Sequence, residues 1–397
     1  MEPRTEVLFI ETASALEALC ARLKDYAWLA VDTEFHREKT YYPQLCLLQI
    51  GTPDFVVGID AYVLTDLTHL LEVIYNPRIT KVMHASRQDL EIFHHLRGKP
   101  PGPVFDTQLA APLLGYPDQI GYANLVQGIL GVKLKKAYTR TDWTRRPLSA
   151  EQVRYALDDV RYLVEIYRYL DKELRRLDRL TWLEEGFAVL IDPALYSNPP
   201  ASAWQRVAGN ERLRGMECLV LQALAAWREQ TARQEDRPRH WLVRDDTLIA
   251  LARLQPETEA GLRRVSGLHP RIAGLYGTHI LGLIARAKLQ PPLQPPAIQR
   301  SKRLTPAQEA LVDCLMAVVR VRSYEHTLDP SVLISRKELE KIVCGEKDLN
   351  TLCRWKHDII GVDLKELLNG RLTLKVDKGR VLLKQDKNCT SGPKGSI

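Results

Sequence analysis

The sequence predicts an α/β domain with a mixed sheet and flanking helices, followed by two all-α domains. Short apolar runs typical of strands alternate with helical patterns as far as residue 192. Two of these runs, 45–50 and 54–59, are separated by Gly51-Thr52-Pro53, which favours an antiparallel hairpin. From residue 211 the apolar spacing is helical, apart from a second hairpin expected within 371–384.

Composition limits the class of protein and its location. A chain of 397 residues is expected to hold more than one domain. Its net charge of +7 favours an anionic partner such as nucleic acid. The seven cysteines are scattered without a C-x-x-C pair, which is typical of reduced thiols in a cytosolic protein. We expect no signal peptide and no membrane span, and therefore a soluble cytoplasmic protein.

The elements of the first domain follow from the spacing of apolar residues. Strands are expected at 6–10, 27–36, 45–50, 54–59 and 79–84, and helices at 13–24 and 66–75. A further helix follows His84, with Ser86 as its N-cap, and others cover 106–115 and 121–131. Ser149 and Gln152 have the spacing of a capping box, which predicts the start of a long helix.

Two acids lie in the expected strand 27–36. Asp32 and Glu34 are two residues apart, so their side chains point to the same side of the sheet. Paired carboxylates repel each other unless a cation lies between them, and their hard oxygen atoms suit Mg²⁺ or Mn²⁺. A D-x-E at the end of an apolar run is also typical of a solvated turn, so a site requires further acids.

Later helices supply candidate partners for these two acids. Asp89 lies in the first turn of its helix, where it either complements the helix dipole or contributes a third carboxylate. Asp106 is expected to be an N-cap. Tyr155 and Asp159 are four residues apart and share one helix face. Asp158 is turned about 100° away, so only one of the two acids points where Tyr155 points.

The segment 133–146 is basic and carries aromatic residues. It holds six lysines or arginines and one acid, a pattern that suits phosphate contacts and base stacking. A solvated loop is the alternative. The candidate RNA contacts are Phe35, Lys135, Lys136, Tyr138, Arg140, Trp143, Arg145 and Arg146.

Taken together, these segments resemble a known family. Those that match are Val31–Phe35, His84-Ala-x-x-x-Asp89-Leu-Glu, Phe105–Ala111, and Asp142-Trp-x-x-Arg-Pro followed by Gln152-x-x-Tyr155-Ala-x-x-Asp159. The set resembles the DEDDy branch of the 3′→5′ exonuclease superfamily, and within it the ribonuclease D family. The resemblance implies a ribonuclease-H-like fold for residues 1–192.

The resemblance also implies roles for individual residues. Two divalent metal ions, Mg²⁺ or Mn²⁺, would be held by Asp32, Glu34, Asp89 and Asp159. Asp32 would bridge both ions and Glu34 would bind one. Tyr155 would orient the attacking water, because a group with a pKa of about 10 is a poor base at neutral pH. The family pattern selects Asp159 rather than Asp158.

The C-terminal half resembles the HRDC domain, the helicase-and-ribonuclease-D C-terminal domain. Residues 211–290 are expected to form a first HRDC domain, and a Pro-rich linker covers 289–303. Residues 304–384 repeat the helical pattern and are expected to form a second HRDC-like domain. Residues 385–397 are expected to be a disordered tail.

These features predict a metal-dependent 3′→5′ exoribonuclease that releases nucleoside 5′-monophosphates. Its expected partner is RNA with a free 3′ end, most plausibly tRNA precursors and other small structured RNAs, with no membrane and no obligate protein partner. A DNA 3′→5′ exonuclease of the same superfamily and a non-catalytic nucleic-acid-binding scaffold are the alternatives.

Overall fold

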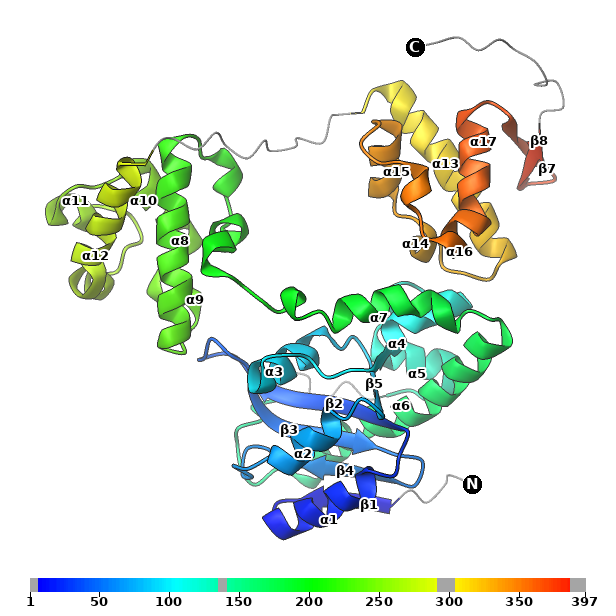
Figure 1. Cartoon of the computed structure of the whole chain (residues 1–397), viewed down its shortest axis with the longest axis horizontal. Coiled ribbons are helices and arrows are strands. Elements are labelled where there is room, and N and C mark those ends of the chain that lie inside the picture. Colours follow the sequence, from blue (N-terminus) through cyan, green and yellow to red (C-terminus); the bar gives the residue numbers. More distant parts are fainter. Residues whose placement is uncertain (1–5, 135–140, 291–303, 386–397) are drawn as a thin grey trace.

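The computed structural model describes residues 6–134, 141–290 and 304–385. In Figure 1 these residues form the predicted nuclease part, which has a central sheet, and two separate helical parts. The predicted tail therefore lies outside the described residues, apart from Gln385, which ends a strand. The candidate RNA contacts Lys135, Lys136, Tyr138 and Arg140 also lie outside them. No helix in the described ranges is long and apolar enough to cross a membrane.

The nuclease part is built on six strands. They are β1 (Glu6–Ile10), β2 (Trp28–His36), β3 (Gln44–Gly51), β4 (Phe55–Ile59), β5 (Thr80–Met83) and β6 (Val104–Asp106). Their order in the sheet is β1-β4-β3-β2-β5-β6. The pairs β2–β3 and β3–β4 are antiparallel, and the other three pairs are parallel. The predicted mixed sheet and its hairpin are confirmed.

Helices cover both faces of this sheet. One face packs against α1 (Ala13–Leu23), α2 (Thr68–Ile74) and α3 (Arg87–Arg97). The other packs against α4 (Thr107–Ala110), η1 (Ala111–Leu114), α5 (Tyr122–Leu130) and the long helix α6 (Ala150–Arg176). Strand β2 serves both cores, because Leu29 and Val31 join the first and Ala30 joins the second.

Helix α6 starts as predicted and approaches the sheet closely. Ser149 and Gln152 form the capping box at its N-terminus. A Cβ atom at Gly51 of β3 would lie 2.7 Å from the carbonyl oxygen of Val160. Only glycine lets α6 approach β3 this closely, and this approach brings the polar residues of α6 toward β2.

The first helical part follows three short 3₁₀ segments. After η2 (Leu180–Leu183) and α7 (Glu184–Leu190), the chain passes through η3 (Pro193–Leu195), η4 (Pro200–Arg206) and η5 (Asn210–Arg212). A single core then unites α8 (Met216–Gln234), α9 (Arg239–Leu242), α10 (Asp245–Leu254), α11 (Glu259–Arg263) and α12 (Pro270–Lys288). Ala203 of η4 and Val207, the residue directly after η4, also belong to this core.

The second helical part has a similar sequence of elements. It contains α13 (Pro306–Glu325), α14 (Pro330–Leu333), α15 (Arg336–Val343), η6 (Leu349–Thr351), α16 (Arg354–Lys356), the π-helix η7 (His357–Gly361) and α17 (Val362–Leu368). The predicted hairpin is present as β7 (Leu372–Asp377) and β8 (Arg380–Gln385).

The two helical parts contact different regions of the nuclease part, as Figure 1 shows. The first meets the loop after β2, where the backbone N–H of Tyr41 donates to Asp236 at 3.0 Å. The second meets η2, the segment that follows α6, where the Trp182 and Trp355 rings stack with centroids 4.4 Å apart. Arg179 adds a hydrogen bond of 2.6 Å to the carbonyl of His326.

Candidate active site

Strand β2 directs Asp32 and Glu34 toward helix α6. Side chains alternate along a strand, so both acids lie on the same side as Ala30, which packs in the core shared with Leu157 and Val160. Strand β5 pairs only with Trp28–Ala30 of β2, so the two acids lie beyond the last β5 pair. The sheet therefore presents both carboxylates next to α6 at an unpaired edge of β2.

Helix α6 brings Asp159 to these two acids. Carboxylate oxygens of Asp32, Glu34 and Asp159 all lie within 4.8 Å of one another. The neighbouring Asp158 is turned away and pairs with Arg161 at 2.7 Å. The register that helix geometry alone left open is therefore set in the structure with Asp159 next to the strand acids.

Asp89 reaches the site differently from the other three acids. It lies in the first turn of α3, is buried, and accepts a hydrogen bond from the Thr33 hydroxyl. Thr33 stands between Asp32 and Glu34 in the chain but points to the opposite face of β2. Asp89 is consequently not part of the group within 4.8 Å, although its charge raises the pKa of both strand acids.

The pKa values of the four acids are all raised, which favours a cation between them. Burial, followed by repulsion from neighbouring carboxylates, raises the pKa of Asp32 well above its usual range and that of Glu34 to about 8. Burial likewise raises the pKa of Asp89 and of Asp159 to about 7. An all-oxygen donor set with mutual repulsion suits divalent ions such as Mg²⁺ or Mn²⁺, which would restore the charged forms.

Gln49 gives a second observation in favour of a polar occupant. It is directly opposite Asp32 in the β2–β3 register, so both side chains lie on the same face. Its amide is fully buried, and neither its oxygen nor its nitrogen has a hydrogen-bond partner in the described part of the chain. Unpaired buried amides are costly, so this side chain is placed to contact ordered water or a ligand next to Asp32.

Tyr155 lies beside the acids and retains its proton. Burial and the charges of Asp159, Glu34 and Asp32 raise the pKa of its hydroxyl to about 12. A phenol with this pKa is protonated at neutral pH, so it acts as a hydrogen-bonding group rather than a base. This agrees with the water-orienting role that the family resemblance implied.

The structure adds Tyr122, which sequence spacing did not single out. Its hydroxyl donates to the backbone carbonyl of Asp159 and lies 3.3 Å from that of Asp158. Its ring lies against His84, with centroids 5.4 Å apart. Tyr122 therefore fixes the turn of α6 that carries Asp159. It begins an ordinary amphipathic helix, and no spacing rule distinguishes it from a packing residue.

Asp106 caps its helix as predicted, and it also binds the loop that leads into α3. Its carboxylate accepts from the Gln108 N–H, as an N-cap does, at 2.8 Å. It also accepts from the backbone N–H groups of Ala85 and Ser86 and from the Ser86 hydroxyl. The Ser86 side chain therefore makes no cap bond of its own, contrary to expectation. Asp106 instead fixes the loop that leads into α3 and positions Asp89.

Two of the predicted RNA contacts, Trp143 and Arg146, make internal contacts in the structure. Trp143 is buried with Cys46, Leu47 and Ala156, so its ring is not available for stacking. Arg146 forms a two-bonded ion pair with the buried Asp60, at 2.5 and 2.6 Å, so its charge is already paired within the domain. The Arg145 side chain is 84% exposed. Phe35 is partly buried next to an irregularity in the β2–β3 register.

Comparison with known families agrees with this geometry. A family model described as 3'-5' exonuclease matches residues 7–175, and a model described as HRDC domain matches residues 219–284. The fold and the family match thus define a 3′–5′ exonuclease with a C-terminal HRDC region. The models give one HRDC match, so the second HRDC domain stays a prediction.

Relatives of this chain extend over nearly its whole length. Ribonuclease D of Acidiphilium cryptum is 38% identical over 382 residues, which cover 95% of this chain and 96% of the relative. Ribonuclease D of Bartonella henselae is 36% identical and covers 95% and 93%. The crystal structure of Escherichia coli RNase D superposes with a TM-score of 0.77 at 30% identity, covering 91% and 98%. The chain belongs to the ribonuclease D family and is a 3′–5′ exoribonuclease.

Proposed function

We propose that the chain hydrolyses RNA from the 3′ end with two divalent ions and releases nucleoside 5′-monophosphates. Asp32, Glu34, Asp89 and Asp159 would hold the ions. The observation that carries this proposal is the convergence of three carboxylates within 4.8 Å, with Asp89 close enough to raise the pKa of two of them. The domains are proposed as 1–192 for the nuclease, 211–290 for the HRDC domain and 304–384 for a second HRDC-like domain.

The reaction is a displacement at phosphorus. Water attacks the last phosphodiester, the bond from phosphorus to the 3′ oxygen of the preceding nucleotide breaks, and that oxygen takes up a proton. Divalent ions, when bound, stabilise the negative charge that develops on the attacking and leaving oxygens. Tyr155 orients the water through its protonated hydroxyl. Tyr122 and Asp106 position Asp159 and Asp89 respectively.

The proposed substrates are tRNA precursors and other small structured RNAs. A net charge of +7 supports a polyanionic partner. The similar Escherichia coli RNase D is described as an exoribonuclease involved in structured RNA processing. The alternative of a DNA exonuclease rests on the shared active-site chemistry, because metal-assisted hydrolysis of a phosphodiester does not require a 2′-hydroxyl.

The second HRDC-like domain is supported by the order of its elements. A long helix, α8 or α13, is followed in each part by a four-residue helix, α9 or α14. Helices α10 and α15 come next, at a similar spacing. This parallel supports one architecture used twice in the chain.

The test is digestion of a 3′-extended tRNA precursor by the full chain with Mg²⁺ or Mn²⁺. We expect stepwise shortening and mononucleotide release by the wild type, none by Asp32→Asn, and wild-type rates for Asp158→Asn. Matched RNA and single-stranded DNA oligonucleotides are digested in parallel. A clear preference for DNA rejects the RNA substrate, and full activity of Asp32→Asn rejects the site.

A further inference from the structure

A cavity rich in arginine lies between the nuclease part and the first helical part. It has a volume of about 460 Å³ and is lined by the loop after β2, by η4, by α8 and by the segment from α9 to the start of α10. Its arginines are Arg37, Arg206, Arg228, Arg239 and Arg244. Its lining includes two carboxylates, Glu229 and Asp245, and Arg37 is paired with Glu91 at 2.8 Å. Five arginines thus face three carboxylates, so positive charge is still in excess. A concave surface with such an excess attracts anions.

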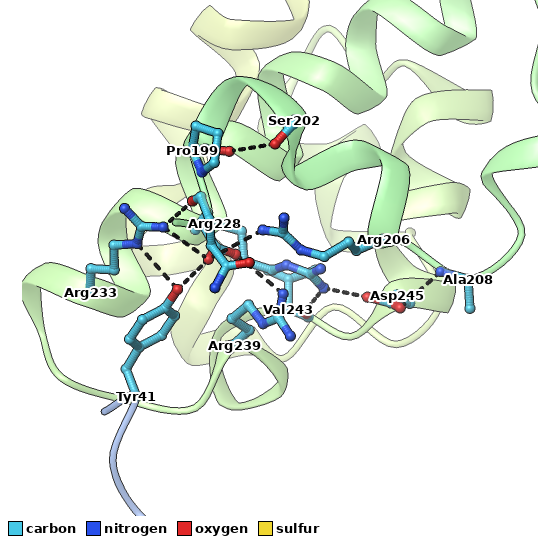
Figure 2. A network of polar contacts seen from close by, with 12 residues as sticks. Tyr41, Pro199, Ser202, Arg206, Ala208, Arg228, Arg233, Arg239, Val243 and Asp245 are labelled. Atoms are coloured by element: carbon cyan, nitrogen blue, oxygen red, sulfur yellow. Dashed lines mark hydrogen bonds and ion pairs between the residues drawn. The ribbon is translucent and has the colours of Figure 1, made fainter. Parts of the chain in front are cut away.

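The two carboxylates hold the arginines in place without neutralising them all. Glu229 is buried, and its single charge is shared by Arg206 at 3.5 Å, Arg233 at 3.5 Å and Arg239 at 3.3 Å. The Tyr41 hydroxyl also donates to Glu229. Figure 2 shows the same hydroxyl hydrogen-bonded to Arg233. Arg206 and Arg239 line the cavity and share this one carboxylate with Arg233, so positive charge remains at the cavity wall.

Arg228 has a buried donor without a hydrogen-bond partner among the described residues. Its side chain is 5% exposed and donates to the Val243 carbonyl at 2.8 Å and to Asp245 at 2.7 Å. Its Nε atom is buried and has no hydrogen-bond partner in the described part of the chain. Burial also lowers the pKa of this guanidinium, so a nearby anion would stabilise its charged form. Arg228 belongs to the cavity lining, so an anion in the cavity would lie next to a guanidinium whose hydrogen bonds are incomplete.

Arg244 and Trp241 add a free cation and an aromatic surface. The Arg244 side chain is exposed and makes no hydrogen bond or ion pair within residues 6–134, 141–290 and 304–385. Trp241 lies in α9 between His240, which lines the cavity, and the buried Leu242, and it is 46% exposed. Proteins bind single-stranded nucleic acid with cations that contact its phosphates and exposed rings that stack on its bases, and Trp241 is the exposed ring next in sequence to the lining residue His240.

We propose that this arginine pocket binds a phosphate group, and that in the working enzyme this is a backbone phosphate of the RNA strand, with a base stacked on Trp241. The inference rests on the proposed RNA substrate. It places a second RNA contact, outside the acid cluster, at the junction of the nuclease part and the first helical part. A free phosphate or mononucleotide presents the same group, so the experiment separates the two sources.

The test measures equilibrium binding by the full chain without divalent metal, so that no hydrolysis occurs. The variants are Arg244→Gln, Arg239→Gln and Trp241→Ala, with Arg263→Gln as a matched control, because Arg263 is 75% exposed and lies outside the cavity. Fluorescence polarisation of a labelled oligoribonucleotide gives the affinity over a range of salt. Thermal unfolding confirms that each variant is folded.

Each substitution has its own expected signature. Loss of a charged hydrogen bond in either arginine variant weakens RNA binding about tenfold. It also flattens the log-affinity against log-salt slope by about 0.7 for one phosphate contact. Trp241→Ala weakens binding by about tenfold at an unchanged slope, because stacking carries no charge. Arg244→Lys restores the slope, and Arg263→Gln binds as the wild type.

Two further outcomes define the source of the phosphate and the limit of the proposal. If inorganic phosphate or AMP binds the wild type, and the arginine variants lose that binding while keeping their affinity for RNA, the pocket takes a free phosphate. If both arginine variants bind RNA and inorganic phosphate as the wild type does, the pocket is a structural ion network and the proposal is overturned. Metal-dependent mononucleotide release by the wild type is scored separately, so a failure of the proposed function is distinguishable.

Discussion

The acid cluster and the arginine pocket each bring several like charges together, but they differ in how those charges are compensated. In the acid cluster, burial and mutual repulsion raise the pKa of every carboxylate, and the described structure contains no ion pair to Asp32, Glu34 or Asp159. In the arginine pocket, a buried glutamate shares its charge among three guanidinium groups. The acid cluster therefore depends on added cations for its charged state, whereas the pocket holds its own geometry and keeps donors for an anion.

The largest effect is expected at Asp32. Asp32→Asn removes one negative charge from the centre of the acid cluster and weakens the binding of divalent ions. The rate of RNA hydrolysis should therefore fall by about a thousandfold or more. Rates of mononucleotide release with Mn²⁺ measure it. Binding of RNA without metal should stay close to the wild-type value, because the arginine pocket is intact. Equal losses of hydrolysis and metal-free binding would mean that the two regions do not act separately.

A smaller catalytic effect is expected at Tyr155. Tyr155→Phe removes the hydroxyl that orients water, so kcat should fall by about a hundredfold with little change in KM. Since the pKa of this hydroxyl is about 12, the group does not titrate between pH 6 and pH 9, and the pH–rate profile should keep its shape. A lost limb in the profile of the variant would show that Tyr155 acts as a base.

Sequence reasoning reached the acid cluster because its parts are local. The i, i+2 spacing on β2 and the i, i+4 spacing on α6 each put two side chains on one face. The family pattern joined these segments and added Asp89. Other contacts join residues about 20 to 40 positions apart, and the spacing of residues in the sequence does not predict them. Examples are the hydrogen bond from the Tyr122 hydroxyl to the Asp159 carbonyl and the bonds from Asp106 to the loop before α3.

The arginine pocket was beyond sequence reasoning for the same reason. Arg37 and Arg244 belong to different domains and meet only because the loop after β2 packs on the first helical part. The basic segment 133–146 was the stronger local pattern, yet Trp143 and Arg146 are used for packing and for an internal ion pair. Charge in the sequence predicted an anionic partner but could not assign the surface that meets it.

The pH dependence of stability should separate the two regions. In the metal-free chain the pKa values of Glu34, Asp89 and Asp159 are raised to about 8, 7 and 7. The folded state then binds more protons than the unfolded state between about pH 4 and pH 8, so stability falls as pH rises through this window. Each pKa unit corresponds to about 1.4 kcal/mol at most.

Thermal unfolding in EDTA at pH 5 and pH 8 measures this difference. Asp159→Asn should reduce the fall in melting temperature, and Mg²⁺ should raise the melting temperature of the wild type at pH 8. Arg244→Gln should leave the fall unchanged, since arginine does not titrate in this range. A fall of the same size in Asp159→Asn would remove the acid cluster as its source.

The smallest effect is expected at Tyr41, which joins the pocket to the nuclease part. Its hydroxyl donates to the buried Glu229 and accepts from Arg233 at 3.2 Å. Tyr41→Phe leaves Glu229 with its arginine partners and removes one charge-assisted bond, so stability should fall by about 1 to 2 kcal/mol, or a few degrees in melting temperature. Tyr42→Phe is the matched control, because Tyr42 stacks on His95 with ring centroids 3.8 Å apart and its ring is kept. Tyr41→Phe removes no arginine, so it should weaken RNA binding less than Arg244→Gln does. A larger loss of RNA affinity in Tyr41→Phe would mean that docking of the first helical part, rather than the charge of the pocket, governs RNA binding.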